Sequence, residues 1–277
     1  SLADDAFLDR ALDDRRKEVR EAALELLRQL PGSSLGLRMA QRARAAVLVE
    51  RRLVGAGRLV VDPPAELDAS LRRDGVAATP ARGLGVSAWL LEEILAGTPL
   101  DTWDDRAVML RLARANDWET ALLHGWAKAA VAQNDAGWAI ALLTEASGTL
   151  RESVRWDLHL VLPPDELGRL AAEALRREDG MAHRLLAIHT GQWPEELSVT
   201  VLETIAHRAR TDRHTWQLGE LCRAAAMAMP PAYADLAGRL ALQLDQEPAD
   251  SSRVRPVADL ARTLAFRQEM FAELASS

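Results

Sequence analysis

The chain has 277 residues and a formal net charge of −7, with 48% hydrophobic and 27% charged residues. This length and composition are typical of a folded helical protein, and the acidic balance argues against a general nucleic-acid binder. A single cysteine excludes a disulfide framework and a thiolate metal cluster. No stretch approaches the roughly 18 consecutive apolar residues of a membrane span. The start lacks a basic leader, so we expect a cytoplasmic protein.

The first predicted element is a helical hairpin over residues 3–12 and 16–30. In its second helix the apolar residues recur at three- and four-residue intervals and form one stripe: Val19, Ala22, Ala23, Leu26, Leu27 and Leu30. So short a hairpin can bury this stripe only against another hairpin, which is the pattern of a stacked helical-repeat protein. Part of the hairpin resembles the conserved core of a HEAT repeat: Asp14, Val19, Arg20, Ala22, Ala23 and Leu26. The resemblance implies an all-α solenoid of antiparallel helix pairs.

A longer helix is predicted from Ser33 or Ser34 to about Val54. On it, three arginines fall within an arc of about 80°: Arg38, Arg42 and Arg52. Residues 38–58 contain six arginines and one glutamate, a net charge of +5 in an acidic chain. Three interpretations stay open: a solvated face or one paired with acids of the next repeat, a surface for an acidic protein partner, or a nucleic-acid surface. The three arginines are our candidate partner-binding residues.

The chain then shows a glycine-rich break and an extended piece at 59–61, after which Pro63-Pro64 leads a short helix to Arg73. Residues 75–85 read as a surface loop or hinge between a segment 1–74 and a segment 86–277. We expect the two segments to form one continuous solenoid that bends at this loop. Residues 83–88 have the G-x-G-x-x-A spacing of a dinucleotide site, but no strand precedes them, which favours a loop.

Helical periodicity continues with short breaks through the rest of the chain, over residues 86–96, 104–115, 118–133, 136–146, 164–177, 194–210, 215–229, 232–244 and 256–274. Alternating valine-rich runs are scarce, so strands should be scarce too. The tryptophans recur at spacings of 35 to 38 residues, the length of a helix pair. We expect them to fill the gaps between helices rather than to stack bases or to line a peptide groove. Cys222, within an Ala/Met run, should be a small buried hydrophobe.

The motifs that carry chemistry are weak. The six histidines lack metal-ligand spacing. Adjacent acids such as Glu92-Glu93 point about 100° apart on a helix, whereas acid–base catalysis needs carboxylates that face each other. The nucleophile and phosphate-loop motifs are absent from the sequence. We therefore predict neither a catalytic residue nor a cofactor or metal.

Several stretches resemble an uncharacterised bacterial family, domain of unknown function 5691. They are the opening hairpin and the segments WLLEEILAGTPLDTW, WQLGELCRAAAMAMPP and FRQEM. Members of that family tend to be encoded beside a SWIM zinc-finger protein, a MoxR-type AAA ATPase and a von Willebrand A protein. The resemblance implies a scaffold that works with such partners, and it implies no catalytic residues.

The sequence thus predicts a non-catalytic helical scaffold that binds a protein partner through Arg38, Arg42 and Arg52 or through the loop at 75–85. Two alternatives stay open. One is a nucleic-acid-binding HEAT protein similar to the alkylpurine glycosylases, which would need a continuous basic groove. The other is an enzyme whose site is assembled in tertiary space, which would need a deep pocket with convergent polar groups.

Overall fold

The computed structural model of the protein describes residues 2–30, 32–50, 57–77, 79–80, 83–211, 215–246 and 251–275. The regular elements among these residues are all helices apart from one two-stranded sheet, which confirms the predicted all-α class. None of the described helices combines the length and the apolar character that a membrane crossing needs. The chain divides into two compact units, Ser1–Leu162 and Pro163–Ser277. Unit 1 includes both sides of the loop at 75–85, whose role as a hinge stays a prediction.

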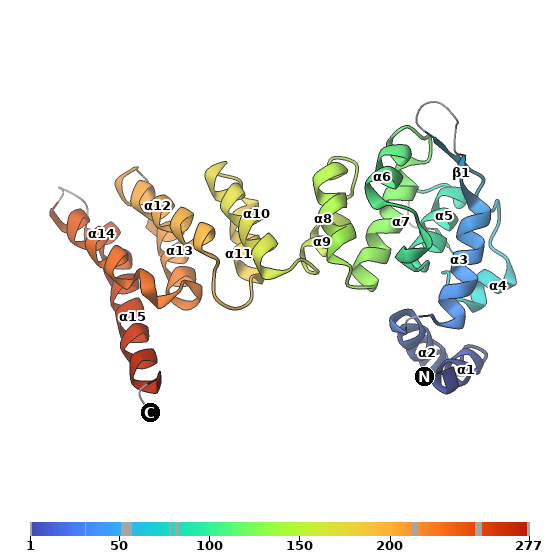
Figure 1. Ribbon diagram of the computed structural model, residues 1–277, viewed down its shortest axis with the longest axis horizontal. Coiled ribbons are helices and arrows are strands. Elements are labelled where there is room, and N and C mark those ends of the chain that lie inside the picture. Colours follow the sequence, from blue (N-terminus) through green and yellow to red (C-terminus); the bar gives the residue numbers. More distant parts are fainter. Residues whose placement is uncertain are drawn as a thin grey trace. The chain divides into compact units, whose positions relative to one another are not determined.

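The elements of unit 1 follow one another along the chain as α1 (Leu2–Ala11), α2 (Lys17–Gln29), α3 (Ser34–Ala46), β1 (Val47–Glu50), β2 (Arg58–Val61), α4 (Ala69–Arg73), α5 (Val86–Ala96), the 3-10 helix η1 (Leu100–Thr102), α6 (Arg106–Arg114), α7 (Glu119–Ala132), α8 (Ala136–Glu145) and α9 (Glu152–His159). Each helix contacts helices close to it in sequence: α1 packs on α2, α3 on α5, α5 on α7, and α7 on α8 and α9 (Figure 1).

The core of unit 1 centres on α5 and α7, which make the most extensive contact between helices in this unit. As the sequence predicts, α5 is buried on more than one side, with Leu90, Leu91 and Leu95 almost inaccessible to solvent. The two helices approach closely because α7 has a glycine at the crossing. A Cβ atom on Gly125 would lie 2.5 Å from Leu95 Cβ and 3.0 Å from the Glu92 carbonyl oxygen.

The predicted helix from Ser33 or Ser34 to Val54 is wrong at residues 47–50, because α3 ends at Ala46; its residues 51–54 lie outside the described part of the chain. Residues 47–50 form β1, which pairs antiparallel with β2 so that Val47 lies opposite Val61. Val47 and Leu59 are buried while Leu48 is exposed, which is the alternation of a half-buried strand. Pairing with a distant segment therefore overrides the local helical pattern, helped by the β-branched valines. The extended piece predicted at 59–61 is confirmed as part of β2.

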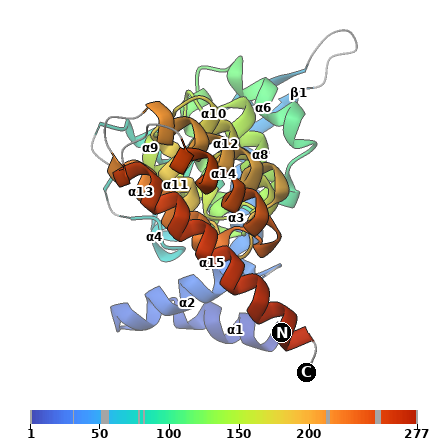
Figure 2. The ribbon, with the colours of Figure 1, turned by 90° about the vertical axis from the view of Figure 1, so that its left-hand side faces the viewer.

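Unit 2 consists of α10 (Pro164–Arg176), α11 (Met181–Ile188), α12 (Glu195–Thr211), α13 (Thr215–Ala228), the 3-10 helix η2 (Pro231–Tyr233), α14 (Ala234–Gln246) and α15 (Ser251–Ala275). Within this unit α10 packs on α11 and α12, α12 on α13, and α15 on α13 and α14. The buried stripe Val257, Leu260 and Leu264 holds α15 to these two helices. The last turns of α15 extend beyond them (Figures 1 and 2).

Three further details of the helix prediction need correction. Helix α4 begins at Ala69 and not after Pro63-Pro64, because Asp68 caps it by accepting the Leu71 N–H at 2.7 Å. Helices α9 and α11 are absent from the sequence prediction. Each has eight residues, little more than two turns, which is too short for a clear helical periodicity. Pro256 lies inside α15 instead of opening it.

The tryptophans mostly lie where helices meet. Trp89, Trp126 and Trp193 are buried. The Trp126 ring also packs against two others, with centroids 5.7 Å from Trp103 and 5.6 Å from Trp138. These contacts match the predicted gap-filling role. Trp216 differs, because 66% of it is exposed at the start of α13.

We expect Gly125→Ala to lower the free energy of unfolding of unit 1 by about 1–3 kcal/mol, because the crossing has no space for a methyl group. The matched control is Gly219→Ala in α13, where a Cβ would meet nothing within 4 Å. That change should raise stability by up to about 1 kcal/mol through helix propensity. Urea unfolding followed by tryptophan fluorescence measures both. Equal midpoints for the two variants would contradict the close approach.

Candidate functional site

Two of the three predicted partner-binding arginines face a buried carboxylate. Asp74, only 1% exposed, accepts hydrogen bonds from Arg38 Nη2 at 2.6 Å and from Arg42 Nη1 at 2.6 Å. Arg42 Nη2 also donates to Ser70 Oγ at 3.0 Å. The third residue, Arg52, lies outside the described residues. The structure thus brings Arg38 and Arg42 together around one acid.

The same network reaches the first helix. Arg38 Nη1 lies 2.9 Å from Asp9 Oδ1, and Arg73 pairs with Asp9 at 3.2 Å and with Asp13 at 2.9 Å. Partial burial opposes ionisation of Asp9, but hydrogen bonds from Arg73 and Arg38 lower its pKa below the ordinary range. These contacts join α1, α3 and α4, and they favour the interpretation that the arginines pair with acids of neighbouring elements. Their role in partner binding stays a prediction.

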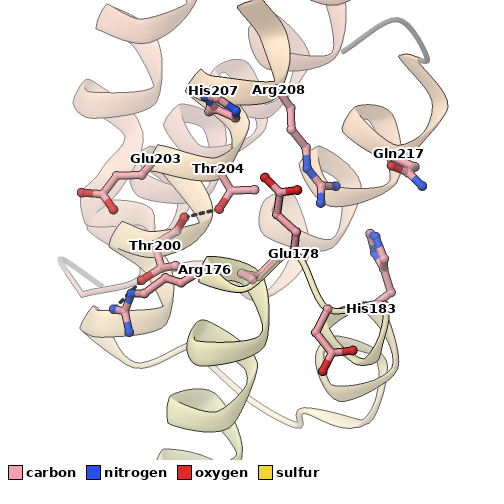
Figure 3. A pocket seen from close by; sticks show the side chains of 12 residues that line it. Arg176, Glu178, His183, Thr200, Glu203, Thr204, His207, Arg208 and Gln217 are labelled. Atoms are coloured by element: carbon pink, nitrogen blue, oxygen red, sulfur yellow. Dashed lines mark hydrogen bonds between the residues drawn. The ribbon is translucent and has the colours of Figure 1, made fainter. Parts of the chain in front are cut away.

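A polar hollow of about 420 Å³ lies in unit 2, and α10, α11, α12 and α13 all contribute to its wall (Figure 3). Glu203 stands on one side of it and His183 and Gln217 on the other, with Glu178 and Arg208 between them. The hollow therefore forms where two successive helical hairpins meet, and its lining depends on how they pack.

The two threonine hydroxyl groups and Arg176 in the wall of this hollow are already engaged. Thr200 Oγ1 donates to the Glu196 carbonyl at 2.8 Å, and Thr204 Oγ1 donates to the Thr200 carbonyl at 2.7 Å. Arg176 donates to Glu196 Oε1 and to Thr200 Oγ1, both at 2.9 Å. Both hydroxyl hydrogens point into helix α12, so Thr204 offers the hollow only oxygen lone pairs.

Carboxylates dominate the remaining charge of the hollow. Glu178, Asp179 and Glu203 line it, and within the described part of the chain no ion pair engages them. Burial, and then the charge of Arg208, lower the pKa of His183, which disfavours the charged form of its imidazole. Arg208 offsets part of the negative charge. The arrangement suits a group that donates several hydrogen bonds and carries positive charge, such as a guanidinium.

Sequence reasoning missed this hollow because its acids come from separate elements. Glu178 follows α10 in a left-handed conformation with φ of 55°, which turns the chain towards α11. Glu203 lies on α12. The available sequence signal was a polar patch, Arg176 to Gly180, between two helices.

The other chemical predictions concern cysteine and metals. Cys222 is buried, and burial raises the pKa of its thiol to about 12, so it is a packed hydrophobe as predicted. In the described residues no group of three or more His, Cys, Asp or Glu side chains could hold a metal ion.

An apolar stripe remains uncovered at the end of α15. It consists of Phe266, Met270, Phe271 and Leu274, which together cover an arc of about 140°. Phe266 is 64% exposed and Leu274 66%. The side chain of Arg267 stays within unit 2, donating to the carbonyls of Ala226 and Met229 at 2.8 and 2.9 Å. Helix α15 is thus fixed at the end of α13, and its last turns present apolar surface to the surroundings.

A family model described as "Family of unknown function (DUF5691)" matches residues 1–274. The chain belongs to this family. Comparison with curated proteins and with solved structures found no match. The match covers both units, so the arginine network, the hollow and the α15 apolar stripe all lie within the part of this DUF5691 chain that the family model describes. The expected HEAT-like character stays a prediction.

We expect the double variant Arg38→Met, Arg42→Met to destabilise unit 1 by about 3–5 kcal/mol, because the buried Asp74 would lose its two closest cations and keep only Arg73, 3.7 Å away. Glu50→Gln is the control. It removes an exposed ion pair with Arg58 and should change stability by less than about 0.5 kcal/mol. Adding Asp74→Asn to the double variant should restore part of the loss. Urea unfolding gives the free energy of unfolding of the wild type, the double variant, the variant that adds Asp74→Asn, and the control. A double variant as stable as the control would show that the fold does not need these arginines, which would leave them free for a partner.

We expect N-acetyl-arginine amide to bind the hollow weakly and N-acetyl-glutamate not to bind, because the unpaired acceptors favour a cation. Amide chemical shifts of unit 2 during titration measure both. Glu203→Gln should weaken binding of the arginine amide severalfold and leave the fold intact, since Glu203 is exposed. Glu195→Gln, on the same helix outside the hollow, is the matched control. Equal affinity of the two variants would exclude Glu203 from the site.

Proposed function

We propose that this chain is a non-catalytic helical-repeat scaffold that binds a protein partner. The packing within each unit supports a repeat architecture. Helices contact mainly helices that are near in sequence, as α5 does with α7 and α12 with α13. Such local contacts are typical of stacked repeats, in which each hairpin covers the apolar face of the next.

The opening hairpin supports the HEAT-like part of the proposal. Arg20 Nη1 donates to the carbonyl oxygens of Asp14 and Arg15 at 2.7 and 3.1 Å, so this arginine closes the turn between α1 and α2. Ala23 and Leu27 are buried, while Leu26 of the predicted stripe is 51% exposed. The hairpin therefore buries one edge of its stripe and leaves the other accessible.

The uncovered α15 apolar stripe is the observation that carries the proposal. Four large apolar side chains within three turns of one helix are unusual on a surface that faces only water. Phe271 continues the face that Leu260 and Leu264 bury against the neighbouring helices, and Phe266 and Met270 extend it around the helix. A protein surface that packs on these turns would bury them as α13 and α14 bury the first half of α15.

We propose that the partner is one of the proteins expected from the family resemblance: the SWIM zinc-finger protein, the MoxR-type AAA ATPase or the von Willebrand A protein. The predicted partner-binding residues Arg38, Arg42 and Arg52 remain a second candidate for recognition. A charge reversal of Arg38 and Arg42 would also remove the two cations closest to Asp74, so loss of binding in such a variant would not separate recognition from folding. The α15 apolar stripe has no such complication.

We expect the triple variant Phe266→Gln, Met270→Gln, Leu274→Gln to lose co-purification with the partner by at least about tenfold, since a few anchors of this kind dominate binding at interfaces. The measurement is affinity purification after co-expression with each of the three candidate proteins. Glutamine keeps helix propensity, and the replaced side chains are exposed, so the thermal midpoint should stay unchanged.

The matched control for this experiment is Gln268→Ala on the same turns of α15, which removes a polar side chain and should leave binding unchanged. Equal recovery of partner with the triple variant and with wild type would place recognition elsewhere on the chain. A stable chain that co-purifies with none of the three candidates would reject the proposed partners.

A further inference from the structure

A buried histidine in unit 1 uses both of its ring nitrogens. His124 is on α7 and is 1% exposed. Its Nε2 lies 2.9 Å from the backbone nitrogen of Arg151, and its Nδ1 lies 2.7 Å from the Thr120 carbonyl oxygen. A backbone N–H can only donate, so Nε2 is the acceptor and the proton resides on Nδ1, which donates to Thr120. The geometry therefore requires a neutral imidazole of a single tautomer.

The residue held by His124 opens the last helix of unit 1. Arg151 is the N-cap residue of α9. Its guanidinium Nη2 also reaches Glu92 on α5 at 2.5 Å, and Glu92 is buried and accepts from Lys128 Nζ at 2.8 Å. Two residues earlier, Thr149 Oγ1 donates to Glu119 Oε1 at 3.2 Å. We call the two contacts of Arg151, with His124 and with Glu92, the Arg151 anchor.

We propose that the Arg151 anchor is a pH-sensitive connection, in which protonation of His124 releases the segment 147–151 and the start of α9 from α5 and α7. Protonation at Nε2 places an N–H donor opposite the N–H of Arg151. The hydrogen bond between them is then lost, and the two N–H groups point at each other. Helix α9 is the last helix before the division of the chain at residue 162, so the released part adjoins unit 2 in sequence.

The charged groups around the imidazole oppose its protonation on balance. Arg151 comes from the segment before α9 and Lys128 from α7 itself, and both disfavour a further positive charge. Glu92 from α5 favours it, but two cations already neutralise this carboxylate. Glu93 from α5 is likewise held by Lys128 at 2.7 Å. Burial in the helix interface adds to the opposition and is the largest cause of the lowered pKa of His124.

The direction of the pH effect follows from this shift. The pKa of His124 is lowered in the folded chain relative to its ordinary value of 6.5. The Arg151 anchor is therefore complete above pH 6.5 and is lost as the pH falls through the lowered pKa. Between pH 6.5 and the lowered pKa of His124, the equilibrium constant for local opening rises by up to about tenfold for each unit that the pH falls. Opening is coupled to the uptake of one proton in this range.

The test is amide hydrogen exchange of the full chain at about pH 7.5 and about pH 5, corrected for the intrinsic pH dependence of exchange. We expect peptides covering residues 147–156 to lose protection severalfold at the lower pH, while peptides of α5 keep theirs. In His124→Gln, which cannot titrate in this range, the protection of 147–156 should no longer depend on pH. His183→Gln in unit 2 is the matched control and should retain the wild-type response.

A second measurement needs no variant and decides the matter if His124→Gln fails to fold. Carbon–proton spectra of the wild-type chain give the pKa of the His124 imidazole, and the amide resonance of Arg151 should titrate with the same midpoint. A pKa at or above 6.5, an Arg151 amide that does not follow it, or unchanged protection of 147–156 at both pH values would each overturn the proposal.

Discussion

The close crossing of α5 and α7 is the contact on which unit 1 depends. It exists because Gly125 has no side chain where Leu95 and the backbone of α5 approach. Helices so close exclude water, and a polar group inside their interface must find its partners within the protein. Glu92 lies in this interface, and its partners Lys128 and Arg151 come from α7 and from the start of α9. Because the buried Glu92 must be paired, the packing of α5 on α7 also fixes the position of Arg151, the residue at which α9 begins.

Unit 1 uses much of its positive charge internally. The basic tract of the sequence, with its excess of arginine, suggests an exposed surface. In the fold, Arg38 and Arg42 instead surround the buried Asp74, and Arg73 connects the same cluster to Asp9. An unpaired buried carboxylate would be strongly destabilising, so these arginines are needed for folding whatever else they bind. Charge counted along a sequence is therefore a weak guide to charge displayed on a surface.

Unit 2 has two surfaces that its own helices do not cover, the polar hollow and the α15 apolar stripe. The polar hollow includes Gln217 near the start of α13, whereas the α15 apolar stripe adjoins the end of α13, where Arg267 is bound. Gln217 and Ala226, whose carbonyl Arg267 contacts, are nine helical residues apart, a rise of about 14 Å. A partner segment of that length could contact both, with a basic side chain in the hollow and apolar side chains against α15. Such two-part recognition needs no reaction chemistry and agrees with a scaffold.

The sequence by itself determined the all-α class, most helix bounds, the buried Cys222 and the family. These follow from short-range properties: helical periodicity in α5 or α7, caps such as Asp105 and Asp135, and local burial patterns. Only the tertiary structure decided that residues 47–50 become a strand, that Asp74 joins Arg38 and Arg42, and that Glu178 and Glu203 meet across one hollow. The physical reason is that strand pairing, charge compensation and cavity shape depend on segments many residues apart, whose distance no local spacing encodes.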